Sequence, residues 1–268
     1  MPLIDLVRFR FQMAELVEQF ADPAGFVKEF LKILDLYSRR ALKPGATNLP
    51  SSLLPAFNCH PQVMKLIRDA ILPSVQEFPE QAISTAGALW EDDHLESREL
   101  AATILGNLPP AYAKHIETHI HNWAHPDVDN VSLDHLLEKS IHSLQINQPK
   151  VVEEMIISYV NHQDPAYQRI GLKMMEQLVR HTEFTQFPML FKHLSRFISK
   201  DTDQLTQLET TAVVAALVDR SPVETTYFLR QLLFLTPGQN ITRTIKRYLP
   251  FFTEDLQEKL ALAIKNHQ

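Results

Sequence analysis

The chain has 268 residues, of which 45% are hydrophobic and 22% charged, and its formal net charge is −6 at pH 7. These values are ordinary for a soluble globular protein, and they exclude a strongly basic nucleic-acid binder, so any contact with nucleic acid would need a local basic patch. No apolar run approaches the ~20 residues that cross a bilayer, so we expect no membrane segment. The only cysteine, Cys59, excludes an intrachain disulfide and favours the cytoplasm; we expect it to be a buried small residue rather than a nucleophile.

Helical periodicity runs through the chain. The apolar residues within 100–108 and within 172–179 fall on one helix face in each segment. No stretch alternates as a strand with hairpin turns does. Pro149, Pro165 and Pro222 follow polar residues that can cap a helix, so each should occupy a first helical position. The sequence therefore predicts an all-α fold of about a dozen short helices.

The predicted helices repeat along the sequence. Equivalent positions recur at spacings of 34, 35, 36, 39 and 35 residues, and they are Met64, Arg98, Leu133, Arg169, Leu208 and Arg243. A period of this size indicates an α-α superhelix, that is, a HEAT-like repeat solenoid of stacked helix pairs. A helical bundle without repeats is the alternative. We expect a single domain over residues 1–268, with a variable loop at about 42–58.

Aspartate-containing turns precede two of the repeat arginines. Asp92 precedes Arg98, and Asp164 precedes Arg169. In a solenoid, the arginine of one inner helix can reach the aspartate of a neighbouring turn, which forms a ladder of ion pairs. Both arginines therefore have a structural role available.

The segment HIETHIHNWAHPDVDN (115–130) is rich in histidine and aspartate. His115 and His119 would share a helix face, as zinc ligands can. In the H-E-x-x-H motif the glutamate follows the first histidine directly, whereas Glu117 comes one position later and about 100° around the helix. The chain also lacks a phosphate-binding glycine loop and a G-x-S-x-G elbow. We expect neither a metal nor a cofactor, and interpret the histidines as a solvated helix face.

Three segments resemble successive blocks of the AlkD-like DNA alkylation repair family, whose members are HEAT-like repeat DNA glycosylases. They are ALWEDDHLESRELAATIL (88–105), NWAHPDVDNVSLDHLLEKSI (122–141) and HQDPAYQRIGLKMMEQL (162–178). The resemblance covers about residues 85–180. It implies a protein that binds double-stranded DNA and that can excise N-alkylated purines by hydrolysing the glycosidic bond.

The resemblance also implies particular site residues. The second block of the family carries W-x-x-x-D, in which the aspartate is catalytic. Trp123 and Asp127 fit this spacing, whereas Asp129 fits better by the residues that follow it; we keep both and slightly favour Asp129. Arg169 matches an arginine that contacts the DNA backbone and the lesion. The aromatic residue of the next family repeat has no counterpart in 206–220, so a branch that keeps the scaffold without the activity is an alternative.

DNA would lie on the concave surface formed by the second helix of each pair. The predicted DNA-binding residues are Arg169, Lys173, Arg98, Arg243, Lys246 and Arg247, whose charges would neutralise phosphates. The alternatives are structural: solvated charges and ladder partners for these cations, a core position for Trp123 and for Trp90, and helix capping for the aspartates. At the level of the whole protein, the alternative is a non-catalytic scaffold that binds a protein partner on the concave face.

Overall fold

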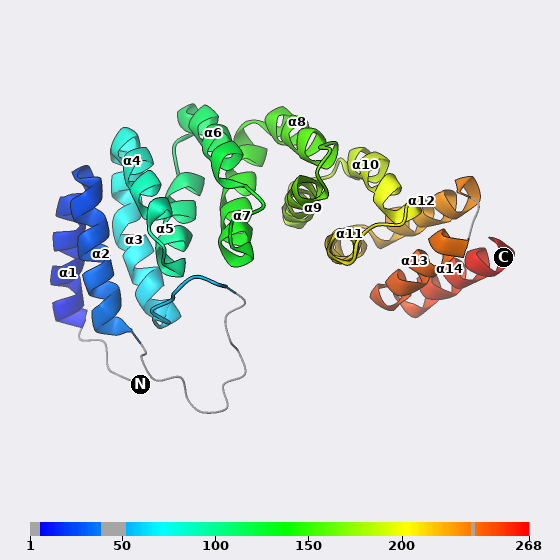
Figure 1. The fold of residues 1–268 in the computed structure, drawn as a ribbon, viewed down its shortest axis with the longest axis horizontal. Helices are drawn as coiled ribbons and strands as arrows, with labels where there is room; N and C mark the ends of the chain where they lie inside the picture. Colours follow the sequence, from blue (N-terminus) through cyan, green and yellow to red (C-terminus); the bar gives the residue numbers. More distant parts are fainter. Residues whose placement is uncertain (1–5, 39–51, 237–238, 268) are drawn as a thin grey trace, which may run out of the picture. The chain divides into compact units, whose positions relative to one another are not determined.

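The computed structural model describes residues 6–38, 52–236 and 239–267 (Figure 1), and all the regular structure in these ranges is helical. The predicted all-α fold is confirmed. The α-helices are α1 (Leu6–Glu18), α2 (Pro23–Tyr37), α3 (Pro61–Glu77), α4 (Pro79–Glu91), α5 (Leu95–Gly106), α6 (Ala113–Trp123), α7 (Asn130–Asn147), α8 (Pro149–Val160), α9 (Pro165–Arg180), α10 (Phe187–Ser199), α11 (Gln204–Arg220), α12 (Pro222–Leu235), α13 (Gln239–Tyr248) and α14 (Glu254–His267). Short 3₁₀ turns are η1 (Gln19–Ala21), η2 (Pro110–Tyr112) and η3 (Leu249–Phe251).

The chain forms two compact units, Met1–Gln148 and Pro149–Gln268. The first contains α1 to α7 and the second α8 to α14, and each unit is described by itself. The single domain over residues 1–268 stays a prediction. No helix in the described ranges is both long enough and apolar enough to span a bilayer.

Helix packing within each unit follows the predicted repeat. In the first unit α5 packs against α4 and α7, and in the second α9 packs against α8 and α11. A helix that contacts its pair partner and also the helix two places further on is the pattern of stacked helix pairs. The six repeat positions all fall on the fourth or fifth residue of alternate helices, namely α3, α5, α7, α9, α11 and α13.

Apolar periodicity and capping residues explain where these helices form. Leu100, Ile104 and Leu105 on α5 are fully buried, as their spacing predicted. Proline begins α8, α9 and α12, which confirms the predicted first positions. Aspartate side chains cap α7, α9 and α11 by accepting hydrogen bonds from backbone N–H groups of the first turn.

The predicted variable loop, 42–58, is only partly within the described residues, since 42–51 lie outside them. Residues 52–58 are irregular, as expected, but hydrogen bonds attach them to the start of α5. The Leu95 N–H donates to the Pro55 carbonyl at 3.0 Å, and the Phe57 N–H donates to Glu96 Oε2 at 3.1 Å. Asn58 has a positive φ of 53°, a conformation that asparagine tolerates better than most residues. This part of the loop is therefore fixed against the start of α5.

Candidate functional site

Trp123, the last residue of α6, is stacked on Trp90 near the end of α4. The ring centroids are 4.5 Å apart and the planes differ by 5°. His119 approaches the Trp123 ring edge-on, with centroids 4.8 Å apart. Trp90 is 8% exposed, so its expected core position is confirmed, whereas Trp123 is half-buried. One face of the Trp123 indole is thus covered by the protein itself.

Arg98 packs against the Trp90 ring of this stack. Its guanidinium carbon is 5.4 Å from the centroid of the Trp90 ring, and its Nη2 is 3.5 Å from Asp93 Oδ1. The Arg98 side chain is only 15% exposed. A guanidinium held over an indole and beside a carboxylate is committed to intramolecular contacts, which favours the structural alternative for Arg98 over DNA binding.

Asp129 caps α7 and also holds the loop that precedes α3. Its Oδ2 accepts from the N–H groups of Val131 and Ser132 at 3.0 and 3.1 Å, and its Oδ1 accepts from the Leu53 N–H at 2.9 Å. Burial acts to raise the pKa of the Asp129 carboxyl, but the hydrogen bonds, including one from the Ser52 hydroxyl, together lower it. Both carboxylate oxygens are therefore used within the fold.

Asp127 lies in the turn between α6 and α7 and is far more accessible. Its side chain is 90% exposed, and its Oδ2 is 3.1 Å from His125 Nδ1. The backbone of this turn is closed by the Val128 N–H, which donates to the His125 carbonyl at 3.0 Å. An indole and an open carboxylate thus occur within one short segment of the first unit.

Arg169 and Lys173 belong to the second unit, on α9, and they face Asp203, which caps α11, and Glu209 of α11. Arg169 Nη1 is 3.8 Å from Asp203 Oδ1, and Lys173 Nζ is 3.4 Å from Glu209 Oε1. Hydrogen bonds from Thr206 lower the pKa of the Asp203 carboxyl, and the charge of Arg169 lowers it further. The contact expected between Arg169 and the aspartate of a neighbouring turn is present, whereas Arg98 pairs with Asp93 of its own preceding turn, so the predicted ladder is formed only in part. Because Trp123 and Arg169 belong to different units, their assembly into one site stays a prediction.

Arg243, Lys246 and Arg247 are all exposed on α13. Arg243 and Arg247 line a small polar cavity of about 70 Å³, together with Lys200 at the end of α10. Arg247 Nη1 donates to Gln207 Oε1 at 2.5 Å, whereas Arg243, Lys246 and Lys200 form no ion pair with any other residue in the described ranges. Lys200 was not predicted from the sequence, because it follows a helix that the repeat pattern does not mark as binding.

The histidines of α6 and the thiol of Cys59 are the other groups that the sequence analysis considered for chemistry. His119 Nδ1 is 2.7 Å from the carbonyl oxygen of His115, and the described part of the chain contains no cluster of three or more His, Cys, Asp and Glu residues that could hold a metal ion. Burial, together with the charge of Glu96, raises the pKa of the half-buried Cys59 thiol to about 12. The thiol is therefore protonated at neutral pH, which agrees with a structural cysteine.

The model of a family described as DNA alkylation repair enzyme matches residues 59–248, well over half of the chain and a longer stretch than the 85–180 seen by resemblance. No curated protein matches the chain. The matched region includes Trp123, both candidate aspartates and the cations of α9 and α13.

Proposed function

Because the chain belongs to the DNA alkylation repair enzyme family, we propose that it binds double-stranded DNA and excises N-alkylated purines by hydrolysing the glycosidic bond. The observation that carries the proposal is the exposed carboxylate of Asp127 in the turn that follows Trp123. The reaction needs no cofactor, because the cationic base is itself a good leaving group.

The chemistry fits a carboxylate beside an indole. Water adds to C1′ of the sugar while the C1′–N bond breaks, and the bonding electrons leave with the alkylated purine, which becomes neutral. Asp127 would stabilise the positive charge that develops on the sugar and take up the proton of the water. We assign this role to Asp127 rather than Asp129, because both oxygens of Asp129 already accept hydrogen bonds. We assign the half-buried indole of Trp123 to contact with the cationic base, which an aromatic ring attracts.

Binding to DNA is assigned first to the end of the second unit. Lys200, Arg243 and Lys246 form no ion pair with a described acidic residue. Lys200 and Arg243 border the small polar cavity together with Arg247, and although Asp201 also lines it, we assign these cations to phosphate contacts. Such contacts give affinity that falls as salt rises and that depends little on base sequence. Arg169 and Lys173 would join the interface only by exchanging their partners on α11 for phosphates.

A specific observation favours the scaffold alternative. The pair Arg169–Asp203 neutralises the arginine that the family resemblance places at the lesion, and Lys173–Glu209 neutralises a second predicted DNA-binding cation. A protein that kept the fold and lost the reaction would retain exactly such internal pairs as structural contacts, and would show no salt-sensitive affinity for DNA.

Release of an N-methylated purine from duplex DNA tests the proposal. Wild-type protein should release the base, and Asp127→Asn should reduce the rate roughly hundredfold. Asp129→Asn should keep most of the activity, because asparagine also caps a helix. Asp69→Asn, at an exposed position on α3, changes the net charge equally and should have no effect.

The outcomes separate the two functions. If wild-type protein releases no base, the glycosylase proposal is wrong. If it also binds duplex DNA without dependence on salt, or not at all, the scaffold alternative replaces it. Loss of activity in Asp129→Asn with full activity in Asp127→Asn would reverse the assignment of the two aspartates.

A further inference from the structure

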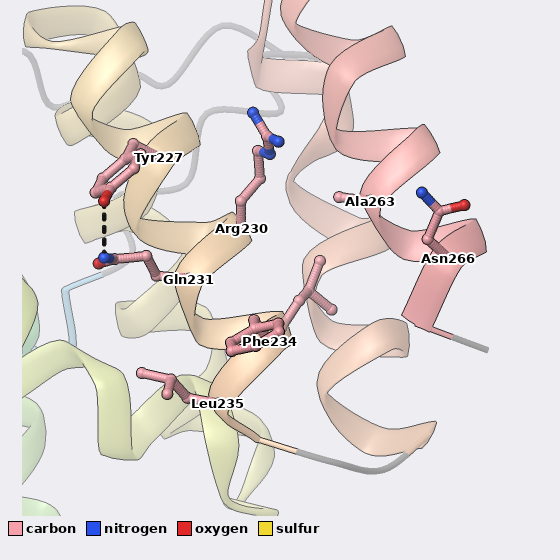
Figure 2. Close-up of a pocket in the computed structure, with 8 residues that line it drawn as sticks. Tyr227, Arg230, Gln231, Phe234, Leu235, Ala263 and Asn266 are labelled. Carbon is pink, nitrogen blue, oxygen red and sulfur yellow. Dashed lines mark hydrogen bonds between the residues drawn. The ribbon is translucent and has the colours of Figure 1, made fainter.

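Hollows of two kinds lie on the second unit. The larger ones, of about 660 and 580 Å³, flank α12 and are bordered mainly by apolar side chains, as Figure 2 shows for Phe234 and Leu235 beside Ala263 of α14. The small cavity of about 70 Å³, which we call the polar cavity, is instead bordered by cations and hydroxyl groups of α11, α13 and the turn after α10. Apolar walls leave a ligand unspecified, whereas charges and hydrogen-bond donors select its chemistry.

One face of α13 borders the polar cavity. Four side chains do so at the i, i+3, i+4 and i+7 positions of the helix, namely Asn240, Arg243, Thr244 and Arg247. Ile241 and Ile245, on another face, are buried in the second unit and hold α13 in place. The turn 200–202, between α10 and α11, supplies another part of the wall. Separate elements therefore bring polar groups to the same place.

The ionised groups at the polar cavity carry an excess of two positive charges. Lys200, Arg243 and Arg247 contribute three positive charges, and Asp201 contributes one negative charge. Tyr248 also borders the cavity, and burial raises the pKa of its hydroxyl to about 12, so this group is neutral at neutral pH. Neither Lys200 nor Arg243 forms an ion pair with another described residue. An excess of this size suits a dianion.

Hydrogen-bond donors without partners occur at the same place. The Thr202 hydroxyl oxygen is buried and has no hydrogen-bond partner among the described residues, and the Thr244 hydroxyl has none there either. Thr210 and Thr211, by contrast, each donate to a backbone carbonyl of their own helix at 2.7 Å. A buried hydroxyl without a partner is uncommon in folded proteins. Rotation about χ1 would turn the Thr202 hydroxyl toward an acceptor in the cavity.

We propose that the polar cavity binds a dianion of the phosphomonoester type, either the terminal phosphate of a DNA strand or inorganic phosphate. Such a group carries about two negative charges at neutral pH and presents at least three oxygen acceptors. The planar guanidinium of Arg243 can bind two of these oxygens, and the ammonium group of Lys200 adds a further contact. This proposal narrows the phosphate contacts proposed above, and it rests on that function for DNA as a source of the phosphate.

A phosphodiester within a DNA strand fits the polar cavity less well. It carries one negative charge, so it leaves one of the two excess positive charges unbalanced. Its phosphorus is also linked to two sugars, and both would have to leave a cavity of about 70 Å³. A terminal phosphate has one such link, and inorganic phosphate has none. Internal phosphates would instead contact the exposed Lys246, which does not border the cavity.

Isothermal titration calorimetry of the full chain with inorganic phosphate tests the site, with dimethyl phosphate at equal ionic strength as the diester. The dissociation constant for phosphate should be about tenfold or more below that for dimethyl phosphate, because of the second charge. Arg243→Gln and Lys200→Gln should each raise it about tenfold. Asp201→Asn should lower it about threefold, because it removes the negative charge at the cavity. Lys265→Gln, which removes a cation of α14 away from the cavity, should leave it unchanged. All four side chains are exposed, so the fold should be unaffected.

Duplexes with different strand ends identify the source of the phosphate. If DNA supplies it, a duplex with 5′- or 3′-terminal phosphates should bind about threefold to tenfold more tightly than the same duplex with hydroxyl ends, as measured by fluorescence anisotropy. Arg243→Gln should abolish this difference. Equal affinity for all strand ends, together with binding of inorganic phosphate as expected above, assigns the polar cavity to free phosphate.

Failure of the phosphate site can be told apart from failure of the proposed function. A chain that releases methylated purines and binds duplex DNA, but binds inorganic phosphate no better than dimethyl phosphate, overturns the phosphate site and leaves the proposed function intact. Phosphate binding that Arg243→Gln and Lys200→Gln leave unchanged also overturns the site. A chain that binds phosphate with the expected effects of these variants, but binds no DNA, supports the site and contradicts the proposed function.

Discussion

The indole ring of Trp123 lies parallel to that of Trp90, at a centroid separation of 4.5 Å. These are the only two tryptophans in the chain, and they come from α6 and α4 respectively. The stack therefore joins the residue that the family resemblance assigns to the site with a residue of the core. Any motion of Trp123 relative to the first unit must break this contact.

Because the two indole rings are stacked, their electronic transitions should couple. This coupling should dominate the tryptophan contribution to the circular dichroism spectrum. We expect an exciton couplet in the far-ultraviolet circular dichroism of the wild-type protein, and its loss in both Trp90→Phe and Trp123→Phe. Phe191→Leu is the control, since it removes a different stacked pair, Phe191 and Phe228, on the second unit. A couplet that survives Trp90→Phe would mean that the two indoles are not stacked in solution.

The cap of α7 should contribute measurably to stability. Replacing Asp129 with alanine leaves the N–H groups of Val131, Ser132 and Leu53 without their acceptor, so the free energy of unfolding should fall by about 1–2 kcal/mol at neutral pH. Urea denaturation measures the difference. Asp69→Ala, at an exposed position on α3, should change the free energy of unfolding by much less.

The same substitution has a defined pH dependence. The pKa of the folded Asp129 carboxyl is lowered from its ordinary value of 3.8, so the ionised group stabilises the fold above the unfolded pKa. That contribution is lost as pH falls through the lower, folded pKa. The gap in stability between wild type and Asp129→Ala should therefore narrow in acid. A gap that stays constant down to the acid transition would show that charge adds nothing to the cap.

The helical architecture could be predicted from the sequence because it depends on local signals. Apolar spacing located α5 and α9, and prolines located the starts of α8, α9 and α12. The contacts that fix the candidate site are not local. The Leu53 N–H reaches Asp129 across 76 residues. The Trp90–Trp123 stack joins α4 and α6, which are one repeat apart, but the repeat pattern does not specify that these rings meet. The sequence therefore kept both aspartates and slightly favoured Asp129, whereas exposure and hydrogen bonding separate them and lead us to propose Asp127.

Neutralising the acidic partners on α11 should strengthen DNA binding, if DNA binds as proposed. Asp203→Asn keeps a capping residue for α11 and removes the negative charge facing Arg169, and Glu209→Gln removes the negative charge facing Lys173. We expect each change to lower the dissociation constant for duplex DNA about threefold to tenfold, and to steepen its salt dependence by up to about one counterion. Fluorescence anisotropy at several salt concentrations measures both quantities. Glu258→Gln, on exposed α14, is the control for net charge, and an equal gain in that variant would contradict a local role for α9.

Arg220, at the end of α11, should be among the most important polar residues for the second unit. Its guanidinium donates to four backbone carbonyls at the end of α9 and in the turn that follows: Nη1 to Val179 and His181 at 3.2 and 2.7 Å, and Nη2 to Thr182 and Phe184 at 2.8 and 3.3 Å. Its positive charge also lies at the C-terminal end of a helix, where the helix dipole favours it. From the sequence, only Pro222, two residues further on, was identified as the start of the next helix.

Lysine cannot replace this arrangement, because a single ammonium group cannot reach both edges of the turn as a planar guanidinium does. Arg220→Lys should therefore lower the free energy of unfolding by about 2–3 kcal/mol, and Arg220→Met by more, because the carbonyls then lose every donor. Arg230→Lys, at an exposed position on α12, should have little effect on the same measurement. Urea denaturation, followed by the circular dichroism of the helices, separates these cases. If Arg220→Lys has the same free energy of unfolding as the wild-type protein, then water donates hydrogen bonds to the four carbonyls as effectively as the guanidinium does.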